Sequence, residues 1–233
     1  TIELEEIGYG IYTNLSSFSL CPHNDALSVD GGVRKKCAIV LREYLMSYRY
    51  FHHVQAEIRH MFDLRRGLRQ HQRDSFLLHL RSPAIMKQKN EKIEVILVGI
   101  HIRKTDMARD SAFRDPPIRY YQDAMNYFRS KYETRHQMVK FVLASDNIPW
   151  CQRQEIFQNV TVIPTNYDAF VSMAILRYCD HMILSLGTFG WWAAYLGGGD
   201  AVYWHHAFDM NHSKHNGKIA LEDYYLPHWV GLE

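Results

Sequence analysis

The sequence lacks the short motifs that mark the commonest phosphate, metal and serine-nucleophile sites. It contains no GxxxxGKS or GxxxxGKT loop, no GxGxxG after a predicted strand and no Asp-x-Asp pair. These absences argue against a P-loop nucleotide site, a dinucleotide-binding oxidoreductase and a metal held on a diphosphate by paired aspartates. There is also no GxSxG turn for a serine nucleophile, and no CxxC pair for zinc or thioredoxin-like chemistry. Any anion site must therefore be built from other side chains.

Neither a strong net charge nor a long apolar run is present. Lysine and arginine number 27 against 25 aspartates and glutamates, so no general attraction to nucleic acid or anionic membrane is expected. No run approaches the roughly 18 apolar residues of a membrane-spanning helix, and no signal peptide opens the chain. The chain begins with Thr1 rather than Met, so we expect a fragment or a processed form.

Three Asn-x-Ser/Thr triplets and an even number of cysteines favour the secretory lumen. The candidate glycosylation sites are Asn14, Asn159 and Asn211. The cysteines are Cys21, Cys37, Cys151 and Cys179. Four free, buried thiols in a cytosolic protein are the alternative, and this choice stays open.

The chain divides into two parts with different patterns. Residues 1–40 carry turn signals and little predicted regular structure, whereas apolar residues in 50–64 recur at helical spacing. The charged segment 87–94, KQKNEKIE, is typical of an exposed linker. We therefore predict a partial, mainly helical N-terminal region over residues 1–92 and a second domain over residues 93–233.

Short apolar runs alternate with helical segments in the second domain. The predicted strands are residues 94–102, 139–145, 160–163, 181–186 and 201–205. The predicted helices are residues 119–132, 150–157, 168–179 and 189–196. Such runs suit strands that are buried on both faces, and the alternation predicts an α/β fold with a doubly wound parallel sheet. Sheets of this kind bind ligands at the carboxyl ends of their strands.

Polar residues follow three of the predicted strands. They are His101, Arg103, Lys104 and Asp106 after the first strand, Ser145 and Asp146 after the second, and Ser185, Gly187, Thr188 and Phe189 after the fourth. The planar fork of an arginine suits a pair of phosphate oxygens, and a helix that begins near Phe189 would direct free N–H groups at an anion. Together they predict a diphosphate site between Arg103 and a helix start. Taken singly, a local salt bridge and an ordinary helix cap are the alternatives.

These segments resemble the α1,2-fucosyltransferases, glycosyltransferase family 11. VGIHIRKTDM is similar to the family's HxRRxD motif. LASDNIPWC, MAILRYCDHMILSLGTFGWWAAYLGGGDAVYW and LPHWVGL resemble its later motifs in the same order, within a likeness that covers roughly residues 45–231. The resemblance implies a GT-B-like fold, with a C-terminal Rossmann-like domain that binds the GDP-sugar and an acceptor-side N-terminal region. It also implies inverting transfer of L-fucose from GDP-β-L-fucose to a galactose 2-hydroxyl, with no cofactor and no metal.

The resemblance also implies roles for the polar residues. Arg103 would bind the donor diphosphate and offset the charge on the departing GDP, and His101 would support the nucleotide site. Asp106 is a candidate base by position, although a salt bridge to Arg103 or Lys104 is an equal alternative. A dissociative transition state would need only weak help from a base. The residues expected to contact GDP-fucose are His101, Arg103, Lys104, Ser145, Asp146, Asp168, Ser185, Gly187, Thr188 and Phe189.

Three features depart from the family's pattern. Lys104 stands where the second arginine of HxRRxD is usual, and Ser172 where an acid suited to guanine is usual, with Asp168 one turn upstream as a substitute. The Gly-rich GxxGNQ segment is absent. We expect a lumenal Golgi enzyme that acts on galactose-terminated glycans and is membrane-anchored in its full-length form. The alternative is a non-catalytic member of the same fold that binds a nucleotide or a glycan.

Overall fold

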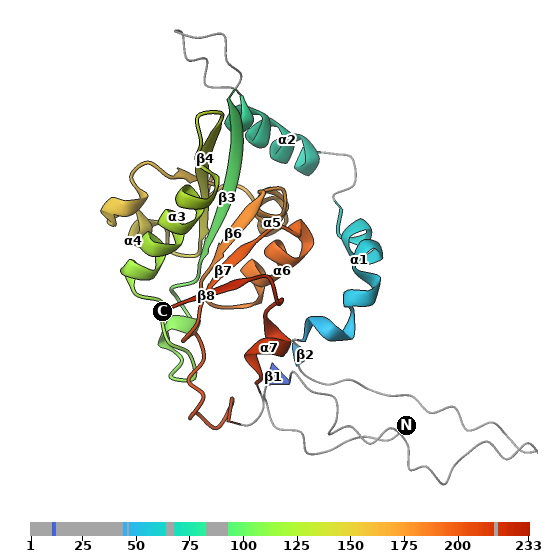
Figure 1. Ribbon diagram of the computed structural model, residues 1–233, viewed down its shortest axis with the longest axis vertical. Coiled ribbons are helices and arrows are strands. Elements are labelled where there is room, and N and C mark those ends of the chain that lie inside the picture. Colours follow the sequence, from blue (N-terminus) through green and yellow to red (C-terminus); the bar gives the residue numbers. More distant parts are fainter. Residues whose placement is uncertain (1–10, 13–43, 46, 64–67, 83–92, 217–218) are drawn as a thin grey trace, which may run out of the picture. The chain divides into compact units, whose positions relative to one another are not determined.

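The computed structural model describes residues 11–12, 44–45, 47–63, 68–82, 93–216 and 219–233 (Figure 1). These residues belong to two compact units, which are described separately. One unit comprises residues 1–53 and 210–227, and the other comprises residues 54–209 and 228–233. The second unit contains every residue that we predicted to contact the donor.

The second unit is built on a six-stranded sheet in which each neighbouring pair of strands is parallel. Its strands are β3 (Glu94–Ile102), β4 (Gln137–Ser145), β5 (Thr161–Val162), β6 (His181–Leu184), β7 (Ala201–Trp204) and β8 (Val230–Leu232). Their order in the sheet is β5-β4-β3-β6-β7-β8. The chain therefore builds outward from β3 in one direction and then returns to build in the other. The point of reversal, between β3 and β6, is where doubly wound sheets bind their ligands.

Helices cover both faces of this sheet. The longer ones are α1 (Gln55–Met61), α2 (Leu68–Arg81), α3 (Ile118–Tyr132), α5 (Ala169–Arg177) and α6 (Thr188–Gly197). The short ones are α4 (Ile148–Gln152), η4 (Met107–Arg109) and η5 (Glu155–Phe157). In Figure 1, α3 lies on one side of the strands, while α5 and α6 lie on the other.

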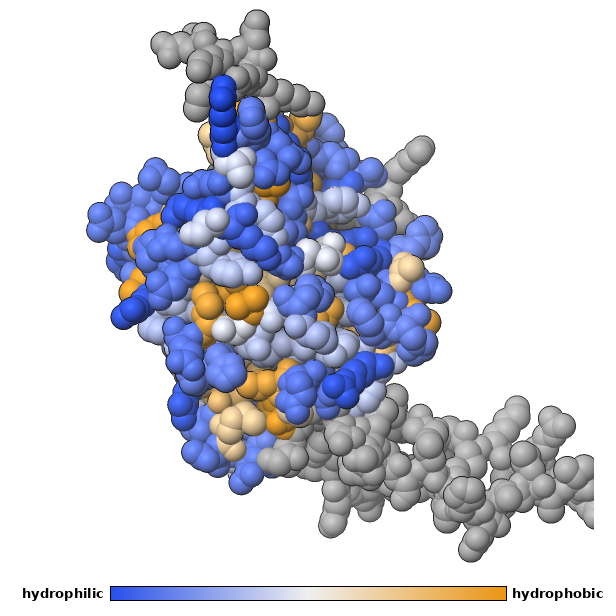
Figure 2. Space-filling model, viewed as in Figure 1, coloured by the Kyte–Doolittle hydropathy of each residue, from blue (hydrophilic) through white to orange (hydrophobic). Residues whose placement is uncertain are grey.

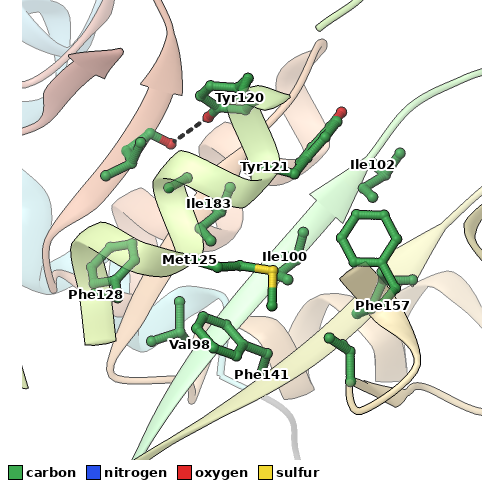
Figure 3. Close-up of a cluster of buried hydrophobic side chains, with 14 of the residues drawn as sticks. Val98, Ile100, Ile102, Tyr120, Tyr121, Met125, Phe128, Phe141, Phe157 and Ile183 are labelled. Atoms are coloured by element: carbon green, nitrogen blue, oxygen red, sulfur yellow. Dashed lines mark hydrogen bonds between the residues drawn. The ribbon is translucent and has the colours of Figure 1, made fainter. Parts of the chain in front are cut away.

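The core between the sheet and α3 follows from the period of each element. Val98, Ile100 and Ile102 alternate along β3, as side chains on one face of a strand do, and none of them is exposed. They pack against the buried face of α3, as Figure 3 shows. The buried hydroxyl of Tyr120 of α3 donates a hydrogen bond to the Leu184 carbonyl at 2.6 Å and also lies 3.1 Å from the Val202 carbonyl. A buried polar tip is thereby satisfied at the end of β6.

The opposite face of β3 packs against α5 and α6. Gly99 permits this approach, since a methyl group there would lie 2.5 Å from Met182 Sδ and 3.0 Å from Leu176 Cδ2. On the outside of the molecule, the face seen in Figure 2 is mostly hydrophilic, and its hydrophobic residues form small separate patches. Most large apolar side chains of this unit are therefore buried in the two core layers.

The first unit contributes a smaller set of elements. These are the parallel pair β1 (Ile11–Tyr12) and β2 (Tyr44–Leu45), the short helix η2 (Tyr48–Tyr50) and α7 (Leu221–Tyr224). The short helix η3 (His52–Val54) ends at the boundary with the second unit. Within the first unit, Arg49 pairs with Asp223 at 2.9 Å. No residue predicted for donor binding lies here.

The predicted α/β class and its parallel sheet are confirmed. The predicted strands are all present with ends that differ by at most two residues, and β8 is an additional strand that we did not predict. The helix predicted at 150–157 is instead the pair α4 and η5. Helices α1 and α2 were assigned to the N-terminal region, but the structure groups them with the sheet rather than dividing the chain after residue 92. Most of the turn-rich residues 1–40 and of the linker 87–94 lie outside the described residues.

Candidate functional site

The carboxyl ends of β3 and β6 meet at the point where the strand order reverses. The Ser185 backbone N–H donates to the His101 carbonyl at 3.1 Å. In return, the Ser185 hydroxyl accepts the backbone N–H of Arg103 at 2.9 Å. The turn that carries Arg103 is therefore fixed to the end of β6. The structure thus brings together the predicted clusters after β3 and β6, and Asp146 of the cluster after β4 joins them.

The guanidinium of Arg103 forms a two-pronged ion pair with Asp106. Nε and Nη2 of Arg103 each lie 2.7 Å from an oxygen of this carboxylate, and Nε lies 3.4 Å from the Asp146 carboxylate. The hydrogen bond to Asp106 raises the pKa of Arg103 and, reciprocally, lowers the pKa of Asp106. The Arg103 side chain is 36% exposed, and Nη1 has no hydrogen-bond partner among the described residues. A fixed cation with free donors is thus available at this rim.

Asp146, which follows β4, holds the turn after β3 in place. Its carboxylate accepts the backbone N–H groups of Lys104 at 2.8 Å and of Thr105 at 3.1 Å, and it also accepts the Thr105 hydroxyl. Burial alone would raise the pKa of Asp146, but the bonds from Thr105 and Lys104 outweigh burial and lower it. An ionised Asp146 therefore shapes the turn around Arg103. We did not predict a role for Thr105, because its contact with Asp146 joins the ends of two different strands.

The Lys104 side chain is committed to neighbours in its own region. Its ammonium pairs with Asp115 and lies 4.0 Å from the ring centre of Trp150, and the side chain is only 9% exposed. These contacts join the loop after β3 to helix α4. We predicted that Lys104 contacts the donor; this role stays a prediction for an ammonium that is already paired with Asp115.

His101 packs the end of β3 against the start of α6. Its imidazole is 5% exposed and lies 5.2 Å from the Phe189 ring, centre to centre. A methyl group at Gly190 would lie 2.7 Å from His101 Nδ1, so only glycine allows this approach. Burial, with a smaller effect of Arg103, lowers the pKa of His101 to about 4. The ring is therefore neutral near pH 7 and supports the site by packing, and Nδ1 has no hydrogen-bond partner within the described part of the chain.

The start of α6 lies beside the turn of Arg103. Gly187 has φ +86°, a left-handed conformation that suits glycine, and a methyl group there would lie 2.9 Å from Met107 Sδ. The N-cap residue of α6 is Gly187, which has no side chain to cap the first turn, and the helix begins at Thr188. The free N–H groups of such a turn attract anions. The start of α6 therefore packs against Met107 and His101, on either side of Arg103 in the chain, and a diphosphate site between Arg103 and this helix start stays a prediction.

Two other predicted donor residues have local partners. Asp168 caps α5 through the Val171 N–H at 2.9 Å and pairs with Arg69 at 2.8 Å. No contact joins Asp168 to the turn of Arg103 among the described residues. The Ser145 hydroxyl accepts the Asn147 N–H at 3.0 Å in the bend after β4. Their roles at the donor site stay predictions.

The modification sites predicted from the sequence are partly visible. Asn159 is exposed in the turn before the edge strand β5, and Asn211 is exposed as well. Cys151 and Cys179 are free and buried. Asn14, Cys21 and Cys37 lie outside the described residues.

The described residues contain neither a candidate membrane span nor a candidate metal cluster. None of the helices there has both the length and the apolar character needed to cross a bilayer. In the same residues, no group of three His, Cys, Asp or Glu side chains is arranged to hold a metal ion.

Comparisons with known proteins identify relatives over most of the chain. A family model, Glycosyl transferase family 11, matches residues 36–233. Galactoside alpha-(1,2)-fucosyltransferase 1 of Sus scrofa is 31% identical over 217 residues, which are 90% of this chain and 56% of that protein. The Homo sapiens protein of the same name is 32% identical over 80% of this chain and 50% of its own length. The chain thus spans about half the length of these relatives.

One solved structure overlaps a smaller part. The fucosyltransferase NodZ from Bradyrhizobium matches 55% of this chain and 41% of its own, with 18% identity and a TM-score of 0.36. An overlap of this size supports no argument about the site.

Proposed function

Because the chain belongs to glycosyl transferase family 11, we propose that it transfers L-fucose from GDP-β-L-fucose to the 2-hydroxyl of a galactose in a glycan. The names of its relatives support this choice of donor, acceptor and linkage. Since the chain covers about half of those proteins, the activity is a proposal for the protein to which this sheet unit belongs.

The observation that carries the proposal is the position of Arg103 at the reversal point of the sheet. Its guanidinium is fixed on one edge by Asp106 and retains free donors on the other. The uncapped start of α6 lies beside the same turn. In the reaction, negative charge develops on the departing GDP, and cationic and N–H donors that are already in place stabilise that charge.

The transfer is a single displacement. The galactose O2 forms a bond to the anomeric carbon of fucose while the bond from that carbon to the β-phosphate oxygen of GDP breaks. Attack from the opposite face inverts the configuration to the α linkage. The hydroxyl proton leaves to a base or to solvent, and Arg103 with the α6 start would receive the diphosphate.

We further propose a reaction without a metal or another cofactor, because Arg103 and the helix N–H groups can supply positive charge where a metal otherwise would. The Asn-x-Ser/Thr triplets at Asn159 and Asn211 support a lumenal Golgi protein. Membrane anchoring of the full-length form belongs to the same proposal.

The test is transfer of labelled fucose from GDP-fucose to a panel of galactosides, with and without EDTA. Arg103→Ala should abolish transfer in a folded protein, while Arg103→Lys, which keeps the charge but loses the fork, should retain only a small part of it. Unchanged turnover in Arg103→Ala would refute the role of Arg103. Titration calorimetry with GDP runs beside the assay, and binding of GDP without any transfer would favour the non-catalytic alternative.

A further inference from the structure

The ion pair between Arg103 and Asp106 uses only one edge of the guanidinium. Two of the five N–H donors of arginine, one on Nε and one on Nη2, point at the two oxygens of Asp106. Nη1 and the second hydrogen of Nη2 form the other edge, which has the same spacing and can receive a second pair of oxygens. Asp106 and a diphosphate can therefore bind Arg103 at the same time.

Asp106 is itself held by the backbone. It precedes the short helix η4, and its Oδ1 accepts the Met107 N–H at 2.8 Å. Asp146, which accepts backbone N–H groups of the turn after β3, places its carboxylate 3.4 Å from Nε of Arg103. A flexible four-bond side chain is thus held in one orientation by groups that are anchored to the chain.

The same contacts make Asp106 a poor base. A general base works best when its pKa lies near the working pH. The hydrogen bond from Arg103, above all, lowers the pKa of the Asp106 carboxyl, and the Met107 N–H acts in the same direction. To accept a proton from a sugar hydroxyl, Asp106 would have to abandon the pair that stabilises its charge.

We propose that Asp106 is a positioning residue that aims the free edge of Arg103 at the donor diphosphate and does not take the acceptor proton. This inference rests on the proposed function, since it assumes that Arg103 meets a diphosphate. Two other roles give different results. If Asp106 were a base, its replacement would lower kcat and leave GDP affinity unchanged. If Asp106 were a gate, its carboxylate would occupy the anion site in the free protein and would be displaced by GDP.

The decisive measurement is the dissociation constant for GDP in matched variants. Asp106→Asn removes the two-pronged ion pair with Arg103 but keeps the size of the side chain. Asp106→Glu keeps a carboxylate that can form the pair. Asp110→Asn removes an equal charge from the same loop, at a side chain that accepts the Ala112 N–H and is not paired with Arg103. Loss of a negative charge near an anion site should tighten binding by Coulomb attraction alone. This charge effect has the same sign in both asparagine variants, so weaker binding in Asp106→Asn is opposite to it and reports the positioning of Arg103.

We expect Asp106→Asn to bind GDP about tenfold more weakly than the wild type, roughly the worth of one charge-assisted hydrogen bond. Its kcat should also fall, Asp106→Glu should recover most of both losses, and Asp110→Asn should not weaken binding. The acidic limb of the pH–rate profile should be the same in the wild type and in Asp106→Asn. Circular dichroism of each variant checks that the fold is kept.

Two results would overturn the proposal. If Asp106→Asn binds GDP as the wild type does but loses turnover together with the acidic limb, Asp106 is a base. If it binds GDP more tightly than both the wild type and Asp110→Asn, Asp106 is a gate. Failure of the proposed function gives a separate result, because a wild type that binds GDP without transferring fucose still allows the comparison of affinities. A wild type that binds no GDP overturns both proposals.

Discussion

Replacing Gly190 by alanine is expected to weaken both the fold and GDP binding. The new methyl group would lie 2.7 Å from Nδ1 of His101 and 2.9 Å from its Cβ and Cγ. The imidazole has little room to move, since it is 5% exposed and packs against Phe189. The strain should therefore be relieved by displacement of the α6 start, which is the part of the helix that we assign to the diphosphate.

Two opposing contributions set the change in stability. Alanine is favoured over glycine within a helix by about 1 kcal/mol. Inserting a methyl group into a packed core costs roughly 1–3 kcal/mol, and the rigid ring of His101 places Gly190→Ala in the upper half of that range. The net loss is then about 1–2 kcal/mol, or a fall in Tm of roughly 2–8 °C for a chain of this size. A helix start displaced by a fraction of an ångström should lower kcat/KM by about tenfold or more.

Gly99→Ala is the matched control. Its methyl group meets the sulfur of Met182 at 2.5 Å, at the flexible end of a side chain in the core below the rim. This variant should lose stability while binding GDP as the wild type does. Thermal unfolding and calorimetry with GDP measure both quantities. Helix propensity alone predicts that Gly190→Ala raises the free energy of unfolding by about 1 kcal/mol. That gain, together with normal GDP binding, would refute the claim that a methyl group at position 190 clashes with His101.

Three further changes test single contacts. Tyr120→Phe leaves the Leu184 carbonyl without its hydroxyl donor and should lower the free energy of unfolding by about 1–3 kcal/mol in urea titrations. Lys104→Met removes the Asp115 pair and the stacking on Trp150, and should cost about 1–2 kcal/mol with little change in GDP affinity; normal stability with lost GDP binding would instead support donor contact. The pKa of His101 is lowered from 6.5 to about 4 in the folded protein. As the pH falls, the imidazole is therefore protonated in the unfolded chain before it is protonated in the folded one. The free energy of unfolding should decrease between pH 6.5 and 4 by up to about 3 kcal/mol. Urea titrations across that range should show a flatter dependence in His101→Gln, and an unchanged slope would contradict a neutral buried ring.

The strands and helices of the sheet unit were predictable because their apolar residues recur with the period of each element. Continuous apolar runs identified β3 and β4 as strands buried on both faces, and the structure confirms them. Strand β8 was missed because VGL, residues 230–232, is too short to form a recognisable run, and pairing with β7 supplies its conformation. A strand of this kind depends on its neighbour rather than on its own sequence.

The site was predictable only as far as strand ends determine it. The rule that ligands bind at the carboxyl ends of parallel strands was enough to bring Arg103 and Ser185 together. It could not determine where long side chains point after the strand ends. Lys104 reaches Asp115, 11 residues further along the chain, and Thr105 binds Asp146 across the sheet. No local pattern records such contacts, because they depend on how two loops approach each other.

The His-x-Arg spacing has a physical reason that follows from the register of β3. Successive side chains of a strand point to opposite faces, and Val98, Ile100 and Ile102 pack toward α3. His101 must then face α6, which its contact with Gly190 bears out. Arg103 continues the same alternation two residues later, so it leaves the sheet on the side where α6 begins. Inserting one residue between Ile102 and Arg103 would send the guanidinium toward α3 while leaving the apolar core of β3 intact. Such an insertion should therefore abolish GDP binding in a protein that still folds, and retention of GDP binding would show that the strand does not set the direction of Arg103.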